Sequence, residues 1–181
     1  QMHKRREQIM RPMIPKPGKN EISRRMSPVR LLIVDDRPPA REGLHALLSV
    51  MGEPFRDGNC PSIVVIGEAC DGTQAMAMVD QEHPDVILMD VRMPGMSGLE
   101  ATRLMKASWP EIPIILMSFY GVHRTDALNA GANSFLLKGC SPDELLKAIM
   151  HASLGTNEND LHRIEAESIH TKKSGGGMQD G

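Results

Sequence analysis

Short apolar segments alternate with longer segments of helical character through the middle of this 181-residue chain, and this alternation limits the possible folds most strongly. The apolar segments, expected to be strands, are 29–34, 63–68, 86–89, 112–117 and 134–137. The segments between and after them, expected to be helices, are 38–51, 73–82, 98–107, 122–130 and 142–150. Strands without polar alternation are buried on both faces, and helical crossovers make neighbouring strands parallel. The pattern therefore predicts an α/β fold, a doubly wound five-stranded parallel sheet with helices on both faces.

Capping residues support two of these helices. Ser97 is followed by Glu100, and Ser141 is followed by Pro142 and Glu144. A serine with Glu three residues later is typical of a helix N-terminus, and Pro suits the first helical turn. We therefore expect helices to begin directly after both serines.

The flanking segments differ in composition from this central part. Residues 1–27 contain eight Lys/Arg and two acidic residues, and we expect 1–28 to be a basic flexible arm. Residues 29–152 are expected to form one domain, and 153–181 to be a polar tail, mostly disordered and too short for an output domain. No apolar run approaches the roughly 18 residues that span a membrane. Three Cys without paired spacing fit reduced thiols, so we expect a cytoplasmic protein without membrane contact.

Polar side chains follow the predicted strands. Asp35 and Asp36 end the first, Asp90 the third, Ser118 the fourth and Lys138 the fifth. Ligands bind at the carboxyl ends of the strands in doubly wound sheets. Each residue taken alone is more often a cap, a turn residue or a solvated charge. Together they predict a site, because three neighbouring carboxylates repel one another unless a cation joins them.

Mg²⁺ suits such a site, because it prefers oxygen ligands and binds through one or two carboxylates together with phosphate. Asp90 is then a candidate nucleophile that attacks phosphorus and forms an acyl phosphate. The Ser118 hydroxyl can donate a hydrogen bond to the phosphoryl oxygens, and the Lys138 ammonium can pair with their charge. The residues therefore indicate phosphoryl chemistry.

Three segments carry a family resemblance: 31–36 (LLIVDD), 84–98 (PDVILMDVRMPGMSG) and 131–138 (GANSFLLK). They resemble the receiver domain of two-component response regulators, closest to receivers that precede a helix-turn-helix output domain. The resemblance covers about two-thirds of the chain and implies that 29–152 is a receiver domain. It also implies a flavodoxin-like fold with strand order 2-1-3-4-5.

The resemblance implies roles for single residues. Asp90 matches the phosphoacceptor, Asp35 and Asp36 the acidic metal pair, and Arg92 the position whose backbone carbonyl completes the Mg²⁺ shell. Ser118 and Lys138 match the phosphoryl-contacting residues, and Ser118 and Phe135 match the switch pair.

The implied mechanism is a switch rather than an enzyme with turnover on outside substrates. A histidine kinase donates phosphate to Asp90, Ser118 moves toward it, and Phe135 turns inward. The surface made by 122–130, 134–137 and the last helix then changes its preference for an output partner, and a homodimer can form on phosphorylation. Direct DNA contact by this chain is not expected. The chain is interpreted either as a fragment of a DNA-binding transcriptional regulator or as a single-domain receiver.

Three features depart from the family pattern. Gly139 stands where Pro usually follows the lysine, and the loop 52–62 is longer than usual. Phe119 follows Ser118 where a small residue is commoner, so we expect its bulk to narrow access to Asp90.

Three other functions remain as alternatives. A Mg²⁺-dependent phosphohydrolase usually needs a second Asp two residues after the nucleophile, where this chain has Arg92. Dinucleotide binding lacks its G-x-G-x-x-G motif after the first strand. A pseudo-receiver that never carries phosphate is disfavoured by the intact set of site residues, although Phe119 is compatible with it.

Overall fold

The computed structural model describes residues 27–51 and 61–155, with the side chain of Met51 excepted. The expected basic arm, most of the expected tail and most of the long loop fall on 1–26, 156–181 and 52–60, which lie outside the described residues. The predictions made for those three segments therefore remain predictions.

Five parallel strands form one sheet in the order β2-β1-β3-β4-β5, as the family resemblance implied. The strands are β1 (Val29–Val34), β2 (Ile63–Ala69), β3 (Val86–Asp90), β4 (Ile114–Ser118) and β5 (Ser134–Leu137). The helical segments are α2 (Pro38–Met51), α3 (Gly72–Glu82), α4 (Gly98–Ser108), η1 (Gly121–His123), α5 (Arg124–Asn129) and α6 (Pro142–Ser153). The predicted doubly wound α/β fold is confirmed.

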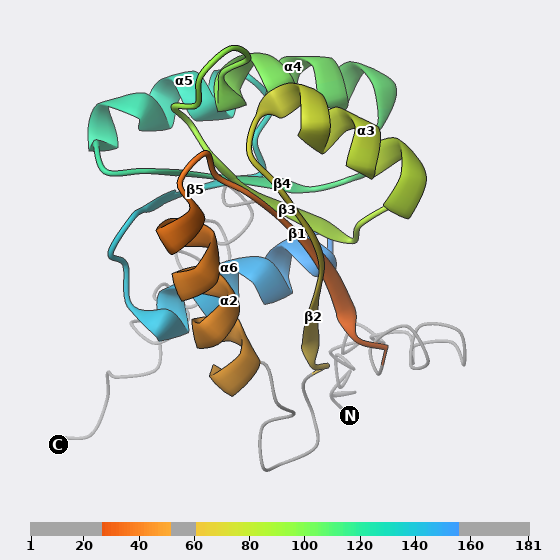
Figure 1. Cartoon of the computed structure of the whole chain (residues 1–181). Helices are drawn as coiled ribbons and strands as arrows, with labels where there is room; N and C mark the ends of the chain where they lie inside the picture. Colours follow the sequence, from red (N-terminus) through yellow and green to blue (C-terminus); the bar gives the residue numbers. More distant parts are fainter. Residues whose placement is uncertain (1–26, 52–60, 156–181) are drawn as a thin grey trace, which may run out of the picture.

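Helices cover both faces of the sheet, with α3, α4 and α5 on one side and α2 and α6 on the other (Figure 1). Every residue of β3 and β4 is buried, which explains why these strands lack polar alternation. Successive residues of a strand point to opposite faces, so Ile87 and Met89 pack under α3 and α4 while Leu88 packs under α2 and α6. The two apolar layers fix the register of the central strands and hence the position of their carboxyl ends.

Serine caps begin two of the helices as predicted. The Ser97 Oγ accepts a hydrogen bond from the Glu100 backbone N at 3.2 Å, and the Ser141 Oγ accepts one from the Glu144 backbone N at 3.2 Å. In each case the side chain satisfies a backbone donor that the helix itself cannot satisfy. These caps set where α4 starts after β3 and where α6 starts after β5.

Several boundaries differ from the prediction by one to three residues, and two elements differ for a clear reason. β4 begins at Ile114 rather than at residue 112, because Pro113 has no backbone N–H for the ladder. The expected helix 122–130 is a 3₁₀ turn, η1, followed by the short α5, and no side chain caps either start. Within the described part of the chain, no helix combines the length and the apolar character that crossing a membrane requires.

Candidate functional site

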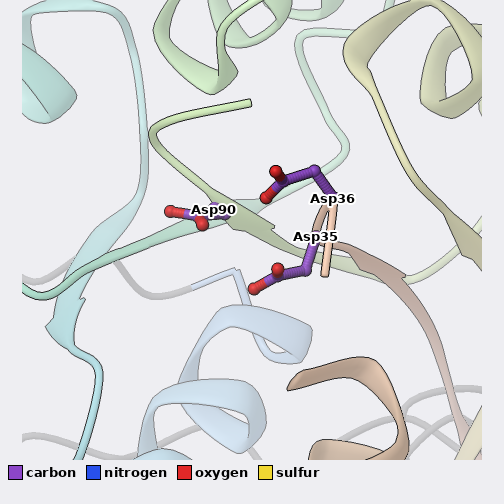
Figure 2. A group of neighbouring side chains, drawn as sticks. All are labelled: Asp35, Asp36 and Asp90. Atoms are coloured by element: carbon purple, nitrogen blue, oxygen red, sulfur yellow. The ribbon is translucent and has the colours of Figure 1, made fainter. Parts of the chain in front are cut away.

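Three carboxylates meet at the carboxyl edge of the sheet (Figure 2). Asp35 and Asp36 directly follow β1, and Asp90 is the last residue of β3, the strand beside β1. One side-chain oxygen from each residue lies within 4.8 Å of the others. The neighbouring positions of β1 and β3 in the sheet therefore bring together acidic residues that are more than fifty positions apart in the sequence.

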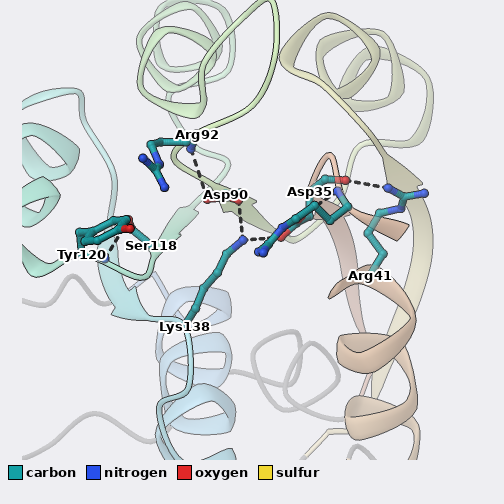
Figure 3. A network of polar contacts seen from close by, with 8 residues as sticks. Asp35, Arg41, Asp90, Arg92, Ser118, Tyr120 and Lys138 are labelled. Carbon is teal, nitrogen blue, oxygen red and sulfur yellow. Dashed lines mark hydrogen bonds and ion pairs between the residues drawn. The ribbon is translucent and has the colours of Figure 1, made fainter. Parts of the chain in front are cut away.

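Lys138 bridges two of these carboxylates (Figure 3). Its Nζ lies 2.5 Å from Oδ2 of Asp35 and 2.5 Å from Oδ2 of Asp90, and its side chain is only 9% exposed. Lys138 follows β5, and its backbone N donates to the carbonyl oxygen of Ser118 at 2.8 Å. The cation thus reaches from the edge strand to the centre of the sheet and partly balances the acidic charge.

Ser118 ends β4 and is 2% exposed. Its Oγ accepts a hydrogen bond from the backbone N of Tyr120 at 3.2 Å. Ser118 lines a cavity of about 370 Å³ together with Asp36, Asp90 and Phe119, and Arg37, Arg92, Met93 and Pro94 complete the lining. The hydroxyl and two of the carboxylates therefore border the same space.

Backbone donors hold the carboxylates in place. The Arg37 N donates to Oδ1 of Asp35 at 3.0 Å, and the Arg92 N donates to Oδ1 of Asp90 at 3.2 Å. Beneath Asp90, a Cβ on Gly98 would lie 2.0 Å from the Asp90 carbonyl oxygen. Only glycine allows α4 to approach the end of β3 so closely.

The carboxylate cluster fits a hard divalent cation. Oδ1 of Asp36 is buried and has no hydrogen-bond partner, although buried polar atoms are almost always satisfied. Two of the three carboxylates already share the single Lys138 cation, so the Asp36 oxygen is left as a free ligand atom. Oxygen ligands of this type are those that Mg²⁺ prefers.

The order of the strands and the residues of the site match those of one protein family. The model of the response regulator receiver domain matches residues 31–150. The chain belongs to the response regulator receiver family. Members of this family are phosphoacceptor switches rather than enzymes that turn over outside substrates, and they generally bind Mg²⁺ at an acidic cluster.

Relatives of this receiver domain are bacterial response regulators. It is 36% identical over 131 residues to the nitrate/nitrite response regulator NarL of Escherichia coli K12, covering 71% of this chain and 56% of that protein. It is 40% identical over 130 residues to the transcriptional regulatory protein LiaR of Bacillus subtilis, covering 70% of this chain and 57% of that protein. The chain thus spans somewhat more than half the length of these curated relatives.

Solved structures agree with this assignment. The signal receiver domain of NarL from Mycobacterium tuberculosis is 34% identical with a TM-score of 0.62, covering 71% of this chain and 98% of that one. A LuxR-family response regulator from Aurantimonas is 28% identical with a TM-score of 0.63, covering 78% of this chain and 99% of that one. Both support the flavodoxin-like receiver fold.

The site of this receiver domain contains contacts that sequence reasoning missed. Arg41 on α2 donates through Nη1 to the carbonyl oxygen of Asp35 at 2.7 Å (Figure 3). Its Nε donates to Oε2 of Glu68 on β2 at 2.9 Å. The guanidinium of Arg92 lies 4.8 Å from the ring centroid of Tyr120. The spacing in the sequence between these arginines and their partners follows no recognisable motif, so the contacts could not be predicted from the sequence.

The structure also places the remaining predicted residues. Phe135 on β5 is 3% exposed and packs in the core beneath α3, α4 and α5, so its switch role stays a prediction. Gly139 has a φ of 97°, which proline cannot adopt, so the turn after Lys138 has a geometry that a Pro there would not allow. Burial raises the pKa of the Cys140 thiol, and the nearby Glu144 carboxylate raises it further.

Proposed function

We propose that this receiver domain accepts a phosphoryl group on Asp90 from a histidine kinase and thereby switches its preference for an output partner. The observation that carries the proposal is the cluster of Asp35, Asp36 and Asp90 beside the Ser118 cavity, with Lys138 paired to Asp35 and Asp90. Such a set of carboxylates, hydroxyl and ammonium suits phosphoryl transfer, which depends mainly on positioning and charge neutralisation.

In the proposed transfer, a carboxylate oxygen of Asp90 attacks the phosphorus of a phosphohistidine. The new O–P bond forms as the P–N bond breaks, and the leaving imidazole takes up a proton. The Ser118 hydroxyl donates to one phosphoryl oxygen, and the Lys138 ammonium moves from its carboxylate partners to pair with the phosphoryl charge. The Arg92 backbone N already donates a hydrogen bond to Oδ1 of Asp90, the oxygen that does not contact Lys138.

Asp35, Asp36, Asp90 and the backbone carbonyl of Arg92 are the groups that we propose to hold Mg²⁺. The unsatisfied, buried Oδ1 of Asp36 supports this assignment. When bound, the ion supplies charge neutralisation for the carboxylates and polarises the incoming phosphoryl group.

The output surface is proposed to lie on α5, β5 and α6. Val122 of η1 and Leu137 at the end of β5 are exposed apolar side chains beside this surface. Phosphorylation adds about −1.5 to −2 charge at the nearby site. Through Ser118 and Phe135, it shifts this surface toward one of two conformations. The same proposal includes homodimerisation on phosphorylation and a cytoplasmic location. It also includes an output in transcription, because the LiaR relative is named as a transcriptional regulatory protein.

Intact mass after incubation with Mg²⁺ and acetyl phosphate tests the proposal. We expect a gain of one phosphoryl group that is labile in base, that Asp90→Asn lacks and that Asp80→Asn retains. Asp80 is an exposed carboxylate on α3 and serves as the matched control. A folded, Mg²⁺-binding protein that gains no phosphoryl group, or an Asp90→Asn variant that still gains one, would contradict the proposal.

A further inference from the structure

An exposed aromatic side chain borders the cavity above Asp90. Phe119 directly follows β4 and lines the same cavity as Asp90 and Ser118, although the residue is 58% exposed. An exposed phenyl ring gains little from burial, so its position must be stabilised by other contacts. The structure shows two such contacts, both with cations.

Arg37 and Lys138 both lie against the Phe119 ring. The Arg37 guanidinium carbon is 5.1 Å from the ring centroid, and the Lys138 Nζ is 5.5 Å from it. Both distances are within the roughly 6 Å range in which a cation over an aromatic face is attracted to the ring. The ring therefore contacts one cation from the β1–α2 loop and one from the end of β5.

Both cations are themselves fixed by Asp35. Arg37 Nε lies 3.6 Å from Oδ1 of Asp35, and Lys138 Nζ lies 2.5 Å from its Oδ2. Lys138 also binds Asp90, so the ring contacts a cation that is ion-paired with the residue proposed to react. Phe119 thus joins loops from three strands across the carboxyl edge of the sheet, where a donor must approach.

We propose that Phe119 is an access-controlling residue: held by Arg37 and Lys138, its ring restricts how phosphoryl donors and water reach Asp90. The proposal rests on the proposed function, since it concerns the rate of the same transfer. A ring that must leave two cations before a donor can approach adds to the barrier for phosphorylation. The same barrier applies to hydrolysis, in which water attacks phosphorus, the bond to the Asp90 oxygen breaks, and inorganic phosphate leaves while the carboxylate is restored.

The rates of both steps test this role. We expect Phe119→Ala to raise the initial rate of phosphorylation by acetyl phosphate, and the rate of hydrolysis of the phosphorylated protein, by about fivefold each. Leu104→Ala, an exposed apolar residue on α4 that does not line the cavity, is expected to leave both rates within about twofold. Circular dichroism confirms that each variant is folded.

The possible outcomes separate this inference from the proposed function. If wild type gains a phosphoryl group and Phe119→Ala shows unchanged rates, the inference is overturned and the proposed function stands. If only Phe119→Ala gains one, the inference is supported, and the proposed function of the wild-type protein fails its own test. If neither folded protein gains one, the inference is overturned and the proposed function fails its own test.

A double-mutant cycle tests whether the cation contact holds the ring. If Arg37 restrains Phe119, the rate increase from Phe119→Ala is smaller in an Arg37→Ala background than in wild type. Equal increases in both backgrounds would show that Arg37 does not restrain the ring and would overturn that part of the proposal. Because the cycle compares increases, any separate effect of the Arg37 charge on an anionic donor cancels.

Discussion

Gly98 lies against the backbone of the proposed phosphoacceptor. Its backbone N donates to the carbonyl oxygen of Val91 at 2.9 Å, and the space for a Cβ is filled by the carbonyl oxygen of Asp90. Backbone atoms cannot move aside as a flexible side chain can. A methyl group at this position must therefore displace α4 or the end of β3, and both movements reach Asp90.

We predict that Gly98→Ala lowers the free energy of unfolding by about 1–3 kcal/mol, as overpacking does, and also slows phosphorylation of Asp90. Urea unfolding and the acetyl phosphate mass assay measure the two effects. Gly43→Ala is the matched control, because a Cβ on Gly43 of α2 meets nothing within 4 Å. A Gly98→Ala protein as stable and as readily phosphorylated as wild type would show that the close approach is unimportant.

Cys140 has a thiol whose reactivity depends on its surroundings. Burial, and secondarily the Glu144 carboxylate, raise its pKa above the ordinary value, while its backbone hydrogen bond has the opposite, smaller effect. A raised pKa favours the neutral thiol, so less of the reactive thiolate is present near neutral pH. Alkylation of Cys140 is therefore expected to be slow at pH 7.5 and to accelerate as the pH rises toward the thiol pKa.

We predict that Glu144→Gln speeds alkylation of Cys140 at pH 7.5 by roughly twofold, because it removes a like charge but leaves the larger effect of burial. Iodoacetamide labelling followed by mass spectrometry measures the rate in a Cys60→Ser, Cys70→Ser background. Asp143→Asn, an exposed acid in the same helical turn, is the comparison. Equal or slower labelling in Glu144→Gln would argue against a role for its charge.

Arg41 connects three secondary-structure elements at the acidic edge. From α2 it donates to the carbonyl oxygen of Asp35 after β1 and pairs with Glu68 near the end of β2. These bonds fix the backbone between the strand and the first helix, where both acidic residues of the proposed metal pair lie. Groups that orient metal ligands in this way commonly change metal affinity when removed.

We predict that Arg41→Ala weakens Mg²⁺ binding by about tenfold while the fold persists. Isothermal titration calorimetry with Mg²⁺ measures the affinity, and circular dichroism reports the fold. Arg103→Ala, an exposed arginine on α4, is expected to bind Mg²⁺ as wild type does. If Arg41→Ala retained wild-type affinity, the Asp35 carbonyl contact would have no effect on the site.

Elements with clear periodicity or capping residues were predictable from the sequence. Val29–Val34 and Pro38–Met51 have the predicted bounds, and the serine caps place α4 and α6. The β4 start was predicted two residues early because Ile112 extends the apolar run, although it packs in the core without joining the ladder. The β1–β2 register shift between Leu31 and Leu32 was not predicted, although Gly67, an isolated glycine within β2, lies at the shift and is the kind of residue that marks a bulge.

The site was predictable where topology alone determines position. Residues at the ends of parallel strands must share one edge, so Asp35, Asp90 and Lys138 were found by listing strand ends. Arg41 was missed because its reach to Asp35 depends on the rotation of α2 about its axis. The Phe119 contacts with Arg37 and Lys138 were missed for a similar reason, because loop conformation decides them.

At the scale of the whole molecule, Lys138 joins the edge of the sheet to its centre. It follows the edge strand β5, yet it pairs with Asp35 after β1 and Asp90 on β3, with β4 between. Three carboxylates with one buried cation leave an excess of negative charge at this edge. The stability of the sheet therefore depends on which cation occupies the cluster.

We predict that Lys138→Met lowers the free energy of unfolding by about 2–4 kcal/mol in EDTA, because it leaves buried carboxylates without their partner. Mg²⁺ should recover part of this loss and stabilise Lys138→Met more than wild type, since the lysine no longer competes for Asp35 and Asp90. Urea unfolding with EDTA or Mg²⁺ measures both effects, and Lys147→Met, an exposed lysine on α6, is expected to match wild type in each. A Lys138→Met protein with wild-type stability in EDTA would show that the bridge contributes nothing to the fold. If Mg²⁺ stabilised it no more than wild type, the lysine and the metal would not share these carboxylates.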